Sequence, residues 1–250
     1  MPPYRYPVSD SAANLLSALG RRFESARDEA KAAGMSRYMR NLFPYYGIPA
    51  PVQRQIFREV LTGAATPTEH ELRSVARACW KRPEREWQYF ACGYLRRHVR
   101  VASPGFLPTV GYLVTTKSWW DTVDSLAAHT TGSLVTTWPE LADAMDEWIA
   151  SDNIWLARTA ILHQLGYKSA TDADRLFSHC LRRAGDPEFF VRKAIGWALR
   201  EYSKTDGPAV RRFVRDHRSE LSGLSQREGL KWLERGGRTP RARKSAGRSI

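Results

Sequence analysis

The segment DNIWLARTAI, residues 152–161, decides the fold, because it returns as DPEFFVRKAI at residues 186–195. Both copies place an aspartate six residues before an arginine, with an aromatic residue between them, and an Ala-Ile pair after the arginine. The two copies are offset by 34 residues without a gap. Moving back by the same offset places Ser118 at the aspartate position and Asp124 at the arginine position. The chain therefore contains an internal repeat.

A fixed period of this length, built from helical units, is typical of an α-solenoid. Helix signals dominate the rest of the chain, and strand-like alternation is nearly absent. We therefore predict an all-α fold, in which antiparallel helix pairs form a curved superhelix with a basic concave face. The spacing of aspartate and arginine in each copy resembles the HEAT repeat.

Helix boundaries are expected at several capping signals. Thr66-Pro-Thr-Glu69 predicts a helix that extends to about Trp80, with Thr66 as N-cap and Glu69 as the capping-box acid. Pro83-Glu84 predicts the start of a second helix that ends near Arg97. Further N-caps are predicted at Ser118, Asp152 and Asp186.

The chain is strongly basic, with a net charge of +13 and a pI near 10.0 over its 250 residues. Such an excess predicts a polyanionic partner. Six of the cations follow Glu234 in a stretch without acids, which leaves +7 on residues 1–234. We expect one folded domain over residues 1–234 and a basic, disordered tail over residues 235–250. The folded part is basic without the tail.

Composition also excludes several classes of site and location. The three cysteines (Cys79, Cys92 and Cys180) are too few and scattered for a disulfide framework or a zinc site, and predict buried side chains of a reduced protein. The six histidines lack ligand spacing, so neither a metal nor a cofactor is expected. No signal peptide or membrane span is recognisable, which predicts a cytoplasmic protein.

The run Lys117-Ser-Trp-Trp-Asp-Thr-Val-Asp124 concentrates aromatic and acidic groups. On a helix, Trp120 and Asp124 share a face because they are four residues apart. An indole beside a carboxylate suits recognition of a cation. Trp119 is instead predicted to belong to the core, and Asp121 to be either a solvated acid or an acid at the helix start. The competing interpretation makes Asp124 an ordinary ion-pair partner.

A second candidate surface follows the Asp186 repeat. One side of this helix is apolar and predicts a core stripe of Val191, Ile195, Ala198, Leu199 and Tyr202. The other side carries Lys193, Trp197, Arg200 and Lys204. Cations there could hold phosphates while the indole stacks on a base or a sugar. Alternatively, another helix covers Trp197.

Two other positions have open interpretations. Arg158 lies on an otherwise apolar stripe, so its guanidinium must find an acceptor. That acceptor is either an aspartate of a neighbouring repeat or a DNA phosphate. Tyr38, between Arg37 and Arg40, is either a phosphate contact or a packed aromatic.

Five segments in order resemble the AlkD family of DNA alkylation-repair glycosylases. The resemblance covers roughly residues 10–234. The segments are residues 37–41 (RYMRN), 83–88 (PEREWQ), 116–124 (TKSWWDTVD), 148–155 (WIASDNIW) and 189–202 (FFVRKAIGWALREY).

The resemblance implies a HEAT-like solenoid that cradles duplex DNA as a monomer and excises purines alkylated at N3 or N7, without a cofactor. It implies that Asp124 is the catalytic carboxylate, that Trp120 and Trp197 flank the lesion, and that Arg158 contacts a phosphate. The family is monofunctional, so a lyase role for Lys117 is not expected. With Arg158, the expected DNA contacts are Tyr38, Lys117, Lys193, Arg200 and Lys204.

Chemistry agrees with this residue set. An alkylated purine carries a positive charge and leaves as a neutral base without a general acid. One carboxylate can then stabilise the oxocarbenium-like sugar and position water. Two other functions stay open: a HEAT-like binder of damaged or structured nucleic acid without catalysis, and a protein–protein scaffold. The preference between methyl lesions and bulky adducts is also open.

Overall fold

A computed structural model describes residues 9–237 of the chain. Every regular element among these described residues is helical, so the all-α prediction is confirmed. The chain divides into two compact units between Ala142 and Asp143. The single domain over residues 1–234 remains a prediction, and the predicted tail lies, from residue 238 onward, outside the described residues.

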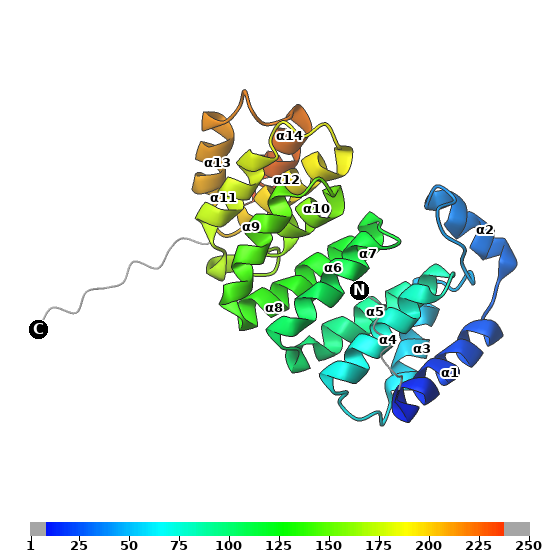
Figure 1. Ribbon diagram of the computed structural model, residues 1–250. Helices are drawn as coiled ribbons and strands as arrows, with labels where there is room; N and C mark the ends of the chain where they lie inside the picture. Colours follow the sequence, from blue (N-terminus) through cyan, green and yellow to red (C-terminus); the bar gives the residue numbers. More distant parts are fainter. Residues whose placement is uncertain (1–8, 238–250) are drawn as a thin grey trace, which may run out of the picture. The chain divides into compact units, whose positions relative to one another are not determined.

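The first unit contains two antiparallel helices, α4 and α5, that pack side by side (Figure 1). Its core includes the fully buried side chains of Phe23, Trp80 and Phe90. The π-helix η3 joins α7 to α8 without a break. The elements are α1 (Asp10–Ser25), α2 (Glu29–Tyr38), α3 (Ala50–Leu61), α4 (Glu69–Lys81), α5 (Arg85–His98), η1 (Val99–Val101), η2 (Pro104–Phe106), α6 (Leu107–Thr115), α7 (Trp120–Ser125), η3 (Leu126–Thr131), α8 (Gly132–Thr137) and η4 (Pro139–Leu141).

The second unit is organised around α12, which packs against both α10 and α14. The predicted core stripe is confirmed for Val191, Ile195, Ala198 and Leu199, which are buried, whereas Tyr202 is only partly buried. The elements are α9 (Ala142–Ala150), α10 (Ile154–Leu162), η5 (Lys168–Ala170), α11 (Ala173–Arg182), α12 (Phe189–Tyr202), α13 (Gly207–Asp216) and α14 (Gly223–Glu234).

Hydrogen bonds from side chains to backbone carbonyls follow the repeat period. In the first unit, the indole N–H of Trp80 donates to the carbonyl of Leu113, 33 residues on, and that of Trp138 to Ala102, 36 residues back. In the second unit, Arg183 donates to Ser151, 32 residues back, and Ser225 to Arg192, 33 residues back. This spacing is consistent with a helical-repeat solenoid of period near 34.

The helix from residue 69 to about 80 is confirmed as α4, but its predicted cap is wrong. Thr68, not Thr66, is the N-cap, and it forms the capping box with Glu71. Both threonines precede a glutamate by three residues, so the local pattern fits either. The structure adds a tertiary reason, because Glu71 also accepts hydrogen bonds from Ser9 and Ser11.

The other three predicted caps are also displaced. Asn153, not Asp152, caps α10 by accepting from the amides of Trp155 and Leu156. α12 begins after Glu188, and the Asp186 side chain accepts from the Glu188 amide before the helix and pairs with Arg183. Ser118 does not cap α7, since its hydroxyl donates to the carbonyl of Val114 at 2.6 Å.

Candidate active site

The segment that leads into α7 has an unusual backbone. Lys117 is left-handed, with φ of +51°, and Trp119 is extended, with φ of −159° and ψ of 159°. α7 then spans only Trp120–Ser125 and has no side-chain cap. α7 continues through η3 into α8, but no side chain caps its first turn, so other elements must fix its start.

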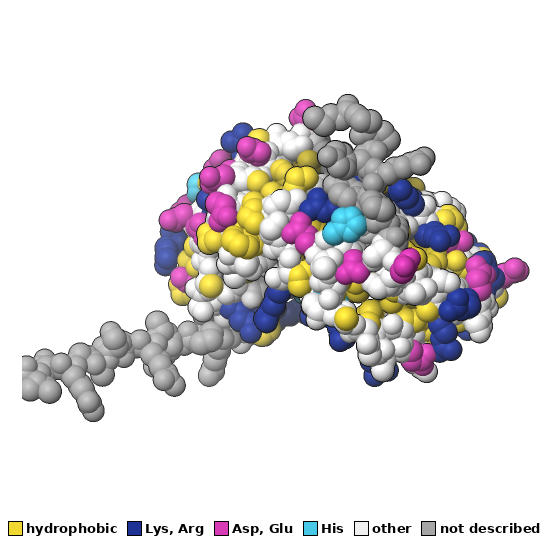
Figure 2. Space-filling view, turned by 60° about the horizontal axis from the view of Figure 1, so that its bottom comes forward, with side chains coloured by type: hydrophobic (Ala, Val, Ile, Leu, Met, Phe, Trp, Pro, Cys, Tyr) yellow, Lys and Arg dark blue, Asp and Glu magenta, His cyan; other side chains and the backbone are white. Residues whose placement is uncertain are grey.

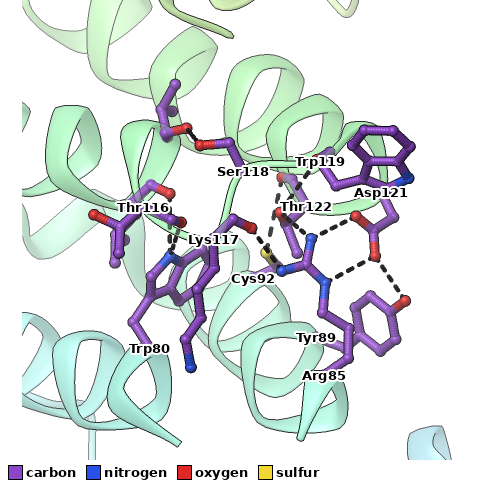
Figure 3. Close-up of polar contacts among 12 residues, drawn as sticks. Trp80, Arg85, Tyr89, Cys92, Thr116, Lys117, Ser118, Trp119, Asp121 and Thr122 are labelled. Atoms are coloured by element: carbon purple, nitrogen blue, oxygen red, sulfur yellow. Dashed lines mark hydrogen bonds and ion pairs between the residues drawn. The ribbon is translucent and has the colours of Figure 1, made fainter. Parts of the chain in front are cut away.

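Arg85, at the start of α5, provides that fixation (Figure 3). Its side chain is fully buried, and its Nε and Nη2 donate to the two Asp121 oxygens at 3.0 and 2.6 Å. Its Nη1 donates to the Lys117 carbonyl at 2.8 Å, and Nη2 also donates to the Thr122 hydroxyl at 2.9 Å. Of the two expectations for Asp121, solvation is therefore wrong, and a place in the first turn of the helix is confirmed.

Two tyrosines complete the environment of Asp121. The Tyr89 hydroxyl donates to Asp121 Oδ2 at 2.7 Å, and Tyr45 and Tyr89 share a hydrogen bond of 3.0 Å. Burial raises the pKa of Tyr45 to about 12 and raises that of Tyr89 well above its usual range. Both phenols therefore stay protonated at neutral pH, and the two oxygens of Asp121 are committed to structural bonds.

Trp119 and Trp120 do not separate into core and surface as predicted. Both are partly buried, and both pack against a cluster formed by Met39, Phe43 and Tyr45. The Arg40 guanidinium lies 5.7 Å from the Trp119 ring centre. The cluster therefore supports the two indoles together, because it contacts both.

Asp124 lies one turn after Trp120 and is partly exposed. The neighbouring Val123 and Leu126 are fully buried and anchor α7 and the start of η3 in the core. The π-helix η3 begins two residues after Asp124, and such segments often occur at functional sites. Trp120 and Asp124 are thus both partly exposed and lie one helical turn apart on α7.

Lys117 and Tyr38 also lie in the first unit, in different settings. The Lys117 ammonium donates to the carbonyl of Arg82, and burial lowers its pKa. Tyr38 ends α2 and is 75% exposed, followed by the left-handed Arg40 and Asn41. Tyr38 is therefore available to a partner, whereas Lys117 already has a structural contact.

Arg158 is a buried residue of α10, with 3% of its surface exposed. Its Nη1 donates to the carbonyl of Phe190, and the guanidinium lies 5.9 Å from the Phe190 ring centre. The contact connects residues 32 apart in the chain, so Arg158 helps to join successive repeats. The predicted phosphate contact of Arg158 remains a prediction.

Two of the α12 cations that were expected to hold phosphates form ion pairs with Glu228 from α14. Lys193 Nζ lies 2.9 Å and Arg200 Nη1 2.7 Å from its carboxylate oxygens. Lys204 instead pairs with Glu201 and lies 5.8 Å from the Trp232 ring centre. The stripe is therefore partly neutralised within the protein. On the face drawn in Figure 2, acidic and basic side chains are likewise interspersed.

α14 packs closely against α12 beside Trp197. A Cβ at Gly196 would lie 2.5 Å from Glu228 Cβ and 3.1 Å from the Ser225 carbonyl, so α14 approaches the backbone here. Trp197, the next residue, is nevertheless partly exposed. The first unit thus carries Trp120 and Asp124 one turn apart on α7, whereas Lys117 bonds to the Arg82 carbonyl. The second unit places Trp197, in the sequence, between two cations held by Glu228.

Arg85, Tyr89 and Glu228 were not predicted from the sequence as functional residues. Arg85 lies inside the segment at residues 83–88 that carries the family resemblance, but the sequence does not indicate which residue it pairs with. Tyr89 follows it by one helical turn. For Glu228 the available hint was a pair of helical glycines, Gly196 and Gly229, which permit close helix packing.

No group of acidic, histidine and cysteine side chains able to hold a metal occurs within residues 9–237. The cysteines are buried and free, as predicted, and burial raises their pKa values. A search of the same residues for helices long and apolar enough to cross a membrane found none.

Comparisons with known proteins define the class. Residues 19–233 match the family model described as DNA alkylation repair enzyme. A solved structure described as "Predicted DNA alkylation repair enzyme from Enterococcus faecalis" is 33% identical, with a TM-score of 0.76. The similarity covers 83% of this chain and 96% of that one. A search of curated proteins found no match. The chain therefore belongs to the AlkD-like family of DNA alkylation repair enzymes.

Proposed function

We propose that the protein is a monofunctional DNA glycosylase that hydrolyses the N-glycosidic bond of cationic N3- or N7-alkylated purines in duplex DNA. The observation that carries the proposal is the position of Asp124, which lies partly exposed on α7 one helical turn after Trp120. The other carboxylate of α7, Asp121, bonds to Arg85 and Tyr89. Membership of a family of DNA alkylation repair enzymes supports alkylated DNA as the substrate class.

The proposed reaction needs little from the protein beyond electrostatics. The alkylated base is a cation, and breaking the bond to the sugar releases it as a neutral molecule. Positive charge then develops on the sugar, and the Asp124 carboxylate stabilises it and positions the attacking water. The Trp120 and Trp197 rings add cation–π attraction to the cationic base or sugar.

Contacts to the DNA backbone belong to the same proposal. Tyr38 is the most exposed member of the predicted set, and Lys193 and Arg200 retain partial exposure within their pairs with Glu228. We assign phosphate contacts to these three residues, together with Lys117, Arg158 and Lys204. These contacts hold the duplex but carry no lesion preference.

The test is release of free base. Wild-type protein is incubated with duplex DNA methylated at purine nitrogens, and the soluble fraction is analysed by mass spectrometry. We expect free 7-methylguanine or 3-methyladenine, and no base from unmodified duplex. A second duplex with a bulky cationic purine adduct compares the two lesion classes. Binding to both duplexes without release from either would contradict the proposal and favour a non-catalytic binder of damaged DNA.

A further inference from the structure

Arg85 holds both ends of the segment that contains the two tryptophans. Its side chain is fully buried and makes four hydrogen bonds, to the Lys117 carbonyl, the Thr122 hydroxyl and both oxygens of Asp121. Trp119 and Trp120 lie between these anchor points in the sequence. A single guanidinium therefore fixes the path of the backbone on either side of both indoles.

The segment depends on this support because its own structure is weak. Lys117 adopts a left-handed conformation that costs free energy for a residue with a side chain. Neither Trp119 nor Ser118 caps α7. The first amides of α7 therefore lack the side-chain acceptor that normally limits fraying.

We propose that Arg85 is a positioning residue, which places Trp120 and Asp124 for the reaction through its bonds to Lys117, Asp121 and Thr122. This inference rests on the proposed glycosylase function. Arg85 touches neither the substrate nor the reacting atoms. It acts by setting where α7 starts, and Asp124 follows that start by one helical turn.

The chemistry at this position requires arginine. The planar fork donates to both oxygens of a carboxylate and keeps a further N–H for a backbone carbonyl, which a lysine ammonium cannot reproduce in one geometry. The guanidinium also lies 3.8 Å from the ring centre of Phe43. Phe43 belongs to the cluster against which both tryptophans pack, so the ring connects Arg85 to the indoles by a second route.

A matched control exists elsewhere in the first unit. Arg73 on α4 pairs with the carboxylate of Glu69, donates to the carbonyl of Gly105 and lies 5.4 Å from the Phe106 ring centre. Its partners are thus of the same kinds as those of Arg85, but they connect α4 to η2. Arg73→Lys reproduces the loss of a guanidinium without disturbing the Lys117–Thr122 segment.

The experiment compares Arg85→Lys, Arg73→Lys and the wild type at a temperature at which all three are folded. Single-turnover release of the alkylated base is measured together with the affinity for undamaged duplex. We expect Arg85→Lys to release base more slowly by about 10- to 100-fold, since small displacements of catalytic groups have effects of this size. Its affinity should be unchanged, and Arg73→Lys should match the wild type in both.

Hydrogen exchange provides a readout that does not require activity. Amides of residues 117–125 should lose protection in Arg85→Lys and keep it in Arg73→Lys. If the wild type releases no base, the proposed function fails, and this exchange pattern still tests whether Arg85 orders the segment. Where Arg85→Lys does not fold, Tyr89→Phe removes one bond to Asp121 and should slow release by about 2- to 10-fold.

Three results would overturn the inference. The first is unchanged release by folded Arg85→Lys or Tyr89→Phe. The second is equal slowing by Arg73→Lys, which would indicate a general loss of stability. The third is unchanged exchange protection of residues 117–125 in Arg85→Lys.

Discussion

The two candidate tryptophans are held by contrasting means. Trp120 is the first residue of α7, and the start of this helix depends on the buried ion pair between Arg85 and Asp121. Trp197 lies within the 14-residue helix α12, which α14 approaches closely at Gly196. The comparison teaches that a tryptophan at the first residue of a helix needs a directional buried contact to fix it, whereas one inside a helix can rely on backbone packing.

The charges near the two tryptophans differ in their access to solvent. The side chains of Arg85 and Asp121 are 0% and 8% exposed, whereas those of Lys193 and Arg200 are 37% and 27% exposed around Glu228. Salt screens exposed charges far more than buried ones. The two regions should therefore respond differently to substitution and to ionic strength.

The largest effect is expected from Asp121→Asn. This change leaves the buried guanidinium of Arg85 without its ion-pair partner and should lower the free energy of unfolding by about 3 to 5 kcal/mol. Urea denaturation at low and high salt measures it, and the loss should be the same in both. Asp174→Asn on the exposed start of α11 is the control and should have little effect. A loss at Asp121 that disappears at high salt would break the comparison.

Acid should destabilise the second unit through His163. This side chain is 1% exposed, and burial lowers its pKa from 6.5 to about 4. Between these values the unfolded chain binds a proton that the folded chain does not, so stability falls as the pH falls. The loss amounts to about 3 kcal/mol across that window.

His163→Gln should flatten this pH dependence, whatever its effect at neutral pH. The measurement is urea denaturation of both proteins across the same pH range, with hydrogen exchange to locate the weakened residues. Equal slopes for the two proteins would rule out His163 as the titrating group.

Gly196→Ala tests the packing that holds α12. The added Cβ would lie 2.5 Å from Glu228 Cβ, so the helices must separate. We expect a loss of about 1 to 3 kcal/mol in thermal or urea unfolding. Gly34→Ala is the matched control, because a Cβ there meets nothing within 4 Å, and it should stabilise the protein by about 0.5 to 1 kcal/mol. Stabilisation by both substitutions would contradict the close approach.

The smallest effect is expected from Glu228→Gln. Hydrogen bonding to Lys193 is the main cause of the lowered pKa of this carboxyl, so the neutral amide loses favourable charge interactions. We expect a loss of about 1 kcal/mol at low salt, shrinking at high salt, because the cations are partly exposed. A loss independent of salt would make this cluster equivalent to the Arg85–Asp121 pair and remove the contrast.

The sequence predicted the helical class and the repeat period because both depend on local patterns. Helix starts were predicted only to within a few residues, since Thr66 and Thr68 both precede an acid at the capping-box distance. The buried ion pair of Asp121 could not be predicted, because its partner Arg85 is 36 residues away in the sequence. Likewise, the sequence predicted that Lys193 and Arg200 could bind phosphates, because it does not show that α14 places Glu228 against both.

The central claim is that Asp124 drives base release, and Asp124→Asn tests it most directly. Single-turnover release of 7-methylguanine and affinity for the same methylated duplex are measured side by side. We predict that release slows by about 100- to 1,000-fold, the range for loss of a group that stabilises transition-state charge, while affinity is retained. Release at the wild-type rate by the folded variant would contradict the account.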